Sequence, residues 1–130
     1  MTKPAPKKIL IVEDDADIAE AMADVLGKLE YEIAGVVTTG EEAVDKIFEI
    51  KPDLIIMDVV LDGRINGIEA SRQLEQFVDI PIIFTTGHRP IATAMQSNKR
   101  IPLLKPFTKE ELQHAIHTAL ASSTHQIPPT

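Results

Sequence analysis

The stretch that decides the fold reads Pro52-Asp53-Leu54-Ile55-Ile56-Met57-Asp58, in which four consecutive apolar residues run directly into a carboxylate. An apolar run this short is typical of a strand that is covered on both faces, as in parallel sheets. Asp58 is then expected at the carboxyl end of the strand. Ligands bind at that edge of open α/β sheets, although an aspartate there also often caps the following turn.

Four further β-rich segments alternate with segments of helical spacing. They lie at residues 9–12, 32–37, 81–84 and 101–104. Between them, except at residues 85–99 where the pattern is poor, apolar residues recur every three or four positions, which predicts helices. Strands that alternate with helices form βαβ units with right-handed crossovers and therefore a parallel sheet. The sequence thus predicts an α/β fold of the three-layer sandwich type.

Several residues predict where individual elements begin or lie. Thr108 and Glu111 have the spacing of a capping box at the start of the last helix. Pro90 permits at most a short helix that starts near it. Pro102 cannot donate a hydrogen bond to a neighbouring strand, so it favours an edge position for the fifth strand.

The length of the chain indicates one compact domain. With 130 residues and 44% hydrophobic content, it is large enough to bury a core. We expect a flexible tail at residues 1–6, a folded domain at residues 7–122, and a tail or the start of a linker at residues 123–130. No apolar run approaches the roughly 18 residues of a membrane span, and the N-terminus lacks a signal peptide. A soluble, cytoplasmic protein without a membrane partner is expected.

Composition excludes several kinds of site. The chain contains no cysteine, so it can form neither a disulfide nor a thiolate metal site. Its formal net charge of -7 argues against binding to nucleic acid, because phosphate backbones are held mainly by clustered Lys and Arg. We therefore expect no nucleic-acid contact through this domain.

Polar side chains follow four of the predicted strands. They are Glu13 and Asp14 after the first strand, Asp58 after the third, Thr85 and Thr86 after the fourth, and Lys105 after the fifth. Because the carboxyl ends of parallel strands share one edge of a sheet, these side chains are expected to converge. Close carboxylates repel one another, and Mg²⁺ is a natural partner for their oxygens. Asp58 could then act as a nucleophile towards phosphorus, with Lys105 and a threonine hydroxyl stabilising the transferring group.

Each of these residues has a simpler explanation when it is taken alone. An acidic pair at the end of a strand is often a helix cap. A lysine before a proline is commonly an ordinary surface residue. The order acid pair, single aspartate, hydroxyl, lysine at four strand ends is much more specific than any one of its parts.

These motifs resemble the receiver domains of bacterial two-component response regulators, the CheY-like family. The resemblance extends from residue 7 to about residue 122. It implies a flavodoxin-like sheet of five parallel strands in the order 2-1-3-4-5. The matching motifs are Val12-Glu13-Asp14-Asp15, Met57-Asp58, Pro81-Ile82-Ile83-Phe84-Thr85-Thr86-Gly87 and Lys105-Pro106-Phe107.

The resemblance assigns a role to the acidic residues. It implies that Asp58 accepts a phosphoryl group from a sensor histidine kinase or a phosphotransfer protein. Glu13, Asp14 and Asp58 would hold Mg²⁺ (or Mn²⁺), with Asp14 as a direct ligand. The backbone carbonyl of Val60 would complete the metal site.

The resemblance also implies a switch. The Thr86 hydroxyl and the Lys105 ammonium would contact the phosphoryl group, and the bond between Lys105 and Pro106 would be cis. Movement of Thr86 would shift a two-state equilibrium at the face of the fourth and fifth strands, where a downstream protein effector reads it. Such a domain is not an enzyme beyond its own phosphorylation and dephosphorylation.

The chain departs from the family pattern in three places. Pro102 stands where an aromatic residue usually couples to the switch threonine. The segment between Thr86 and Lys105 is a few residues short, which predicts a stunted fourth helix. The loop after Asp58 contains Asp62-Gly63 where many receivers have a proline, and it is one residue longer.

The residues after the fourth strand resemble a narrower branch of the family. Thr86, Gly87 and His88, together with a proline in the fifth strand, are similar to mostly stand-alone receivers that relay or store phosphoryl groups. Gly87 and His88 could tune the lifetime of the phosphoryl group. The alternative for His88 is a solvated loop histidine.

Other functions remain open. The chain could be a receiver-fold binding module that acts without phosphorylation, or the N-terminal receiver of a larger hybrid kinase or regulator. A phosphatase with an aspartate nucleophile would need a second aspartate where Val60 stands. A flavin-binding module would need a phosphate-cradling loop after the first strand, where Glu13 and Asp14 would repel the phosphate.

Overall fold

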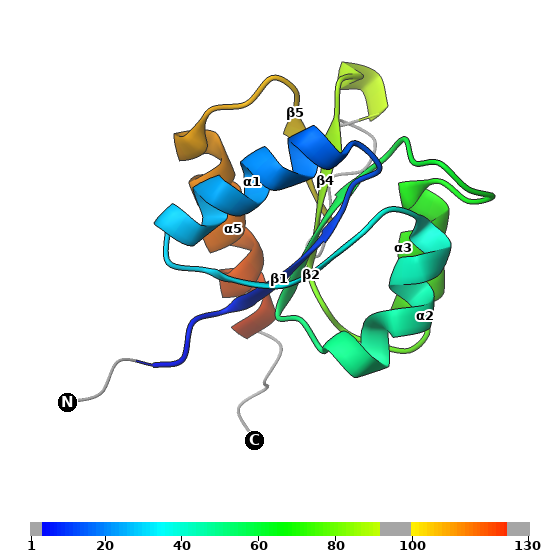
Figure 1. Ribbon diagram of the computed structural model, residues 1–130, viewed down its shortest axis with the longest axis horizontal. Coiled ribbons are helices and arrows are strands. Elements are labelled where there is room, and N and C mark those ends of the chain that lie inside the picture. The colour runs from blue at the N-terminus through cyan, green and yellow to red at the C-terminus, as the bar shows by residue number, and fades with distance from the viewer. Residues whose placement is uncertain (1–3, 92–99, 125–130) are drawn as a thin grey trace.

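The computed structural model describes residues 4–91 and 100–124. The predictions for a stunted fourth helix and for the chain ends therefore fall partly outside the described residues, at 92–99, 1–3 and 125–130. Figure 1 shows the elements in space. In chain order they are β1 (Lys8–Val12), α1 (Ala16–Lys28), β2 (Glu32–Val37), α2 (Gly40–Ile50), β3 (Leu54–Asp58), α3 (Gly67–Glu75), β4 (Ile82–Thr86), β5 (Arg100–Leu104) and α5 (Lys109–Thr124).

The strands form one parallel sheet in the order β2-β1-β3-β4-β5. Every residue of β3 and β4 is buried, which explains why these strands read as unbroken apolar runs. The edge strands β2 and β5 are partly exposed. Pro102 lies in β5, so its predicted edge position is confirmed. The predicted α/β fold and strand order are also confirmed.

Helices cover both faces of the sheet, with α1 and α5 on one side and α2 and α3 on the other (Figure 1). Side chains alternate between the faces along each strand, so Ile9 and Ile11 contact the first layer while Leu10 and Val12 contact the second. In the described part of the chain, no helix combines the length and the apolar character needed to cross a lipid bilayer.

Local hydrogen bonds fix where the helices begin. Asp15 caps α1 immediately after the acidic pair at the end of β1. Asn66 and Glu69 form a capping box at the start of α3. The capping box predicted from Thr108 and Glu111 is present at the start of α5. Each cap stabilises its helix by about 1 kcal/mol and places its first turn next to a strand end.

The last helix extends slightly beyond the predicted end of the folded domain at residue 122, which itself stays a prediction. Helix α5 continues to Thr124, two residues into the segment expected to be a tail or linker. Such a difference is within the one or two residues by which helix ends commonly vary.

After β4, a helical turn begins at Arg89 and includes Pro90, consistent with the predicted start near that proline.

Gly67 allows α3 to begin directly against the end of β3. Its N–H donates a hydrogen bond to the Val59 carbonyl at 2.8 Å. A Cβ atom at this position would lie only 2.2 Å from the Asp58 carbonyl oxygen, which belongs to the backbone and cannot rotate away. The close approach of α3 therefore depends on the absence of a side chain at residue 67, and it fixes the backbone that carries Asp58.

Replacing Gly67 by alanine is expected to lower the free energy of unfolding by about 1–3 kcal/mol, because α3 must move away from β3. Gly27→Ala is the matched control. Gly27 is exposed in α1 with nothing near its missing Cβ, so alanine there is expected to stabilise by up to about 1 kcal/mol. Urea denaturation of both variants checks this. Equal effects of the two substitutions would contradict the role of close approach at Gly67.

Candidate functional site

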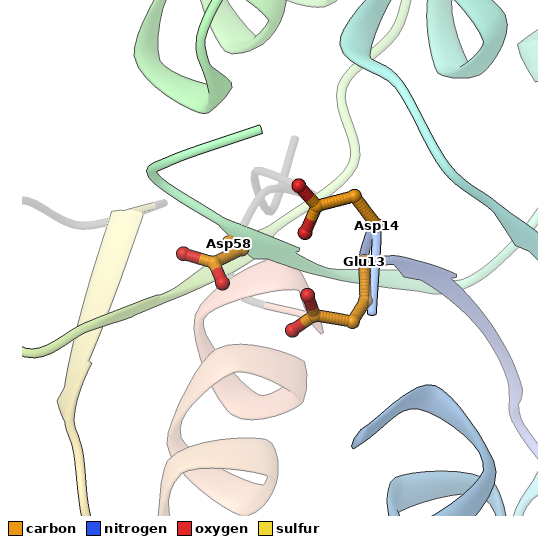
Figure 2. Close-up of side chains that lie close together, drawn as sticks. All are labelled: Glu13, Asp14 and Asp58. Atoms are coloured by element: carbon orange, nitrogen blue, oxygen red, sulfur yellow. The ribbon is translucent and has the colours of Figure 1, made fainter. Parts of the chain in front are cut away.

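Three acidic side chains converge at the carboxyl edge of the sheet. Glu13 and Asp14 follow β1, and Asp58 is the last residue of the neighbouring strand β3. Figure 2 shows their carboxyl groups gathered around one space. One carboxylate oxygen from each lies within 4.8 Å of the others. Glu13 is 3% exposed and Asp58 is 7% exposed, whereas Asp14 is more open to solvent.

The two oxygens of Asp58 have different partners. Oδ2 forms an ion pair with the Nζ of Lys105 at 2.7 Å. Oδ1 accepts a hydrogen bond from the Val60 N–H at 3.1 Å. Lys105 is held in place by its own N–H, which donates to the Thr86 carbonyl at 2.7 Å. The peptide bond from Lys105 to Pro106 is cis, as the resemblance implied.

The acidic cluster carries more negative charge than its surroundings balance. Burial is the main reason that the pKa of Glu13 rises to about 7. A hydrogen bond to Asp14 and the charge of Asp58 raise this pKa further, while the Asp15 N–H and Lys105 oppose the rise. The same hydrogen bond from Glu13 lowers the pKa of Asp14. In the absence of another cation, the Glu13 carboxyl therefore keeps its proton up to about pH 7.

This donor set fits a hard divalent cation. Mg²⁺ binds through carboxylate, carbonyl and water oxygens, and one or two protein carboxylates suffice. The cluster offers three carboxylates and one facing ammonium, from Lys105. A cation placed there would favour the ionised form of Glu13, against the burial and the nearby carboxylates that now raise its pKa. The residues predicted from the sequence for metal binding thus lie together, apart from the Val60 carbonyl, whose direction remains a prediction.

The structure places Thr86 and His88 in one local network. The buried Thr86 side chain accepts a hydrogen bond from the His88 N–H at 3.1 Å. The exposed His88 side chain accepts one from the Ile91 N–H through Nδ1, at 3.3 Å. His88 therefore caps the helical turn after β4, a role that sequence reasoning missed. Gly87 has open space where a Cβ would stand, so packing does not require glycine there.

Sequence reasoning also missed a contact from the loop after β3. The N–H of Asp62 donates to Oδ2 of Asp14 at 3.2 Å, and this bond helps to lower the pKa of Asp14. Asp62 also forms an isolated parallel bridge with Thr39. The donor is a backbone group, so no residue type could have revealed it. The extra length of the loop was the one visible signal.

An apolar groove opens beside the site, between α1 and the start of α5. It has a volume of about 200 Å³. Two residues that line the groove follow site residues closely in the sequence. Phe107 is two residues after Lys105, and Ile18 is four residues after Asp14. Its apolar lining includes Ile18, Met22, Val25, Phe107 and Leu112.

Comparison with known proteins agrees with this fold. Residues 9–117 match the family described as the response regulator receiver domain. The chain is 30% identical over 115 residues to the chemotaxis protein CheY of Thermotoga maritima, covering 85% of this chain and 95% of CheY. It is 34% identical over 119 residues to the transcriptional regulatory protein PdtaR of Mycobacterium tuberculosis, covering 89% of this chain and 58% of PdtaR.

A solved structure shows the same fold along nearly the whole chain. It is the signal receiver domain of a modulated diguanylate cyclase from Desulfovibrio desulfuricans. The two chains superpose with a TM-score of 0.81 at 28% sequence identity, covering 94% of this chain and 99% of the other. The chain thus spans almost all of CheY and of this receiver domain, but little more than half of PdtaR.

The metal-free protein is expected to lose stability as the pH rises from about 4.5 to about 7. The pKa of Glu13 is about 7 in the folded protein against an ordinary value of 4.5. Between these values the folded state keeps a proton that the unfolded state has lost, so the free energy of unfolding falls as the pH rises. Glu13 is expected to contribute roughly 2–4 kcal/mol to this fall. Above pH 7 its contribution is gone.

Urea unfolding in EDTA at a series of pH values measures the effect. The difference in the free energy of unfolding between the wild type and Glu13→Gln should shrink by roughly 2–4 kcal/mol from pH 4.5 to pH 7, because glutamine does not titrate. Glu20→Gln, on the exposed side of α1, is the control and should keep the pH dependence of the wild type. A Glu13→Gln curve that runs parallel to the wild-type curve would exclude buried Glu13 as the cause.

Proposed function

Because the chain belongs to the response regulator receiver family, we propose that it accepts a phosphoryl group on Asp58 and switches a protein-interaction face in response. Residues 7–122 would form the receiver domain. The observation that carries the proposal is the Asp58 carboxylate, which is nearly buried, paired with Lys105 at 2.7 Å and adjacent to Glu13 and Asp14. Receiver domains act as signalling modules rather than as conventional enzymes.

The acidic cluster would hold Mg²⁺ through Glu13, Asp14 and Asp58, with the Val60 carbonyl as a further ligand. When bound, the cation would neutralise charge on the carboxylates and on the incoming phosphoryl oxygens. The raised pKa of Glu13 supports this assignment, because it results mainly from burial of the carboxyl and further from the nearby Asp14 and Asp58, which a bound cation would offset.

In the transfer step, one Asp58 oxygen forms a bond to phosphorus while the bond from phosphorus to the donor's histidine nitrogen breaks. The electron pair of that bond remains on the donor's imidazole, and the product is an acyl phosphate on Asp58. The Val60 N–H and the Lys105 ammonium orient the carboxylate before the reaction, since they bind its two oxygens separately. Lys105 then offsets charge on the phosphoryl oxygens.

The switch would pass from Thr86 to the turn that follows β4. The Thr86 hydroxyl now accepts the His88 N–H, and it would reorient to donate to a phosphoryl oxygen. Its movement would pull on the turn capped by His88, beside β5 at the edge of the sheet. This route needs no aromatic residue in β5, which suits the presence of Pro102. A downstream protein would read the altered face.

Incubation with Mg²⁺ and acetyl phosphate tests the phosphoryl acceptor. The wild type is expected to gain one phosphoryl group that hydroxylamine removes, as an acyl phosphate requires. Asp58→Asn should gain none. Lys105→Ala should be phosphorylated at least about tenfold more slowly, because it loses a charge that stabilises the transferring group. Intact-mass spectrometry measures each adduct.

The absence of an adduct in the wild type would instead favour a binding module that acts without phosphorylation. An adduct that persists in Asp58→Asn would place the acceptor elsewhere. Asp53→Asn is a control because Asp53, which is exposed at the opposite end of β3, accepts a hydrogen bond from the Lys8 N–H and lies outside the acidic cluster. Its phosphorylation should match that of the wild type.

The groove beside the site is the proposed docking place for the donor protein. A histidine side chain can reach Asp58 only if the donor covers the site, and the groove is lined by Phe107, two residues after Lys105, and by Ile18, four residues after Asp14. Its lining is apolar and partly exposed; Ile18, for example, is 42% exposed. An amphipathic helix of a histidine kinase or phosphotransfer protein would bury these side chains and gain affinity from the hydrophobic effect.

Ile18→Ala is expected to slow phosphorylation by a histidine kinase or phosphotransfer protein about three- to tenfold, while the rate with acetyl phosphate stays unchanged. The small molecule needs no docking surface, so only the protein donor loses contacts. Phe48→Ala is the matched control, because Phe48 is 58% exposed on α2, away from the groove. The docking assignment fails if both variants accept phosphoryl groups from the protein donor at the wild-type rate.

A further inference from the structure

The loop between β3 and α3 is fastened to the first turn of α2 by Glu41. The Arg64 N–H donates to Oε2 of Glu41 at 2.8 Å. This bond is the main reason that the pKa of Glu41 lies below its usual value. Gly63, directly before Arg64, has a φ of +101°, a conformation that favours glycine. The loop therefore adopts a backbone shape that presents its N–H to the Glu41 carboxylate.

The contact between Glu41 and Gly63 is unusually close. A Cβ atom on Gly63 would lie 2.8 Å from Oε1 of Glu41 and 3.0 Å from Oε2. Oε1 is covered by the loop and has no hydrogen-bond partner among the described residues. A buried oxygen without a hydrogen-bond partner lowers the stability of the fold, so such an arrangement needs a compensating interaction. The other carboxylate oxygen, Oε2, supplies it, because its hydrogen bond anchors the loop.

The same loop reaches the acidic cluster. The N–H of Asp62, next to Gly63, donates to Oδ2 of Asp14 at 3.2 Å. Asp62 also bridges to Thr39, which caps the helix that carries Glu41. A continuous series of contacts thus runs from Glu41, through the loop, to Asp14. The extra residue of this loop, recognised in the sequence, belongs to this connection.

We propose that Glu41 is a positioning residue for the cation site. By anchoring Arg64, it holds the loop where the Asp62 N–H orients the carboxylate of Asp14. The inference rests on the proposed function, because Asp14 matters in this way only if the cluster binds a cation. Groups that orient a metal ligand commonly change metal affinity about 10- to 100-fold when they are removed. Glu41 acts through one further step, so a smaller effect is expected.

Mg²⁺ titration followed by amide NMR tests the proposal on the full chain. Glu41→Ala is expected to weaken Mg²⁺ binding about three- to tenfold and to speed hydrogen exchange at the Arg64 amide in the metal-free protein. Gly63→Ala should weaken binding in the same direction, because its Cβ would push the Glu41 carboxylate away from the loop and its φ would be strained. Thermal unfolding of each variant reports whether the fold is intact.

Two control variants separate the effect of the anchoring contact of Glu41 from the effect of its negative charge. Asp45→Asn removes one negative charge from the exposed side of α2, one turn beyond Glu41, and measures the general electrostatic effect. Glu41→Gln removes the same charge but keeps an oxygen that can accept the Arg64 N–H. Both variants should bind Mg²⁺ within about twofold of each other and more tightly than Glu41→Ala.

The outcomes distinguish the inference from the function on which it rests. If the wild type binds Mg²⁺ and Glu41→Ala binds it as tightly as Asp45→Asn does, Glu41 does not position the site. Faster exchange at Arg64 without a change in Mg²⁺ affinity leads to the same conclusion. If the wild type binds no Mg²⁺, the proposed cation site itself is wrong.

Discussion

The site depends on the burial of three mutually repelling carboxylates at one edge of a parallel sheet. Glu13, Asp14 and Asp58 are brought within reach of one another because β1 and β3 are neighbours that end at the same edge. Lys105 is the ammonium that faces them, through its ion pair with Asp58. Apolar burial along the strands supplies the free energy that holds this unfavourable arrangement. Burial and repulsion together prepare the site for a cation and a phosphoryl group.

The sheet was predictable because its signals are local and repeated. Short apolar runs that alternate with helical spacing define the strands, and their burial in β3 and β4 follows directly. The convergence of Glu13, Asp14, Asp58 and Lys105 was predictable too, since each follows a strand and parallel strands align their ends. In these cases residue type and position in the chain contain the necessary information.

The remaining features depend on backbone groups or on close contacts between distant segments. The Asp62 N–H that binds Asp14 is present in almost any residue, so no sequence pattern marks it. Gly67 reads as an ordinary loop glycine until the Asp58 carbonyl is seen against it. His88 is exposed, and its ring nitrogen caps a turn, a role that does not test whether it also tunes the phosphoryl group. Such roles are visible only when the chain is folded.

The loop after β3 connects the acidic cluster to the start of α2. It contains the Val60 N–H that binds Asp58 and the Asp62 N–H that binds Asp14. Its far side is anchored on Glu41, at the start of α2. A cation or phosphoryl group at the site would therefore act on a segment that is already held at both ends. This constraint favours a site that is organised before its ligands arrive, which lowers the entropic cost of binding them.

The most direct test of the central claim is the free energy of unfolding at pH 7.5 as a function of Mg²⁺ concentration. If the carboxylates form a cation site, stability should rise with the logarithm of Mg²⁺ concentration above the dissociation constant, by about 1.4 kcal/mol for each tenfold increase. Asp14→Asn should flatten this dependence, because it removes a ligand charge. Wild-type stability that does not change with Mg²⁺, while ionic strength is held constant, would contradict the account.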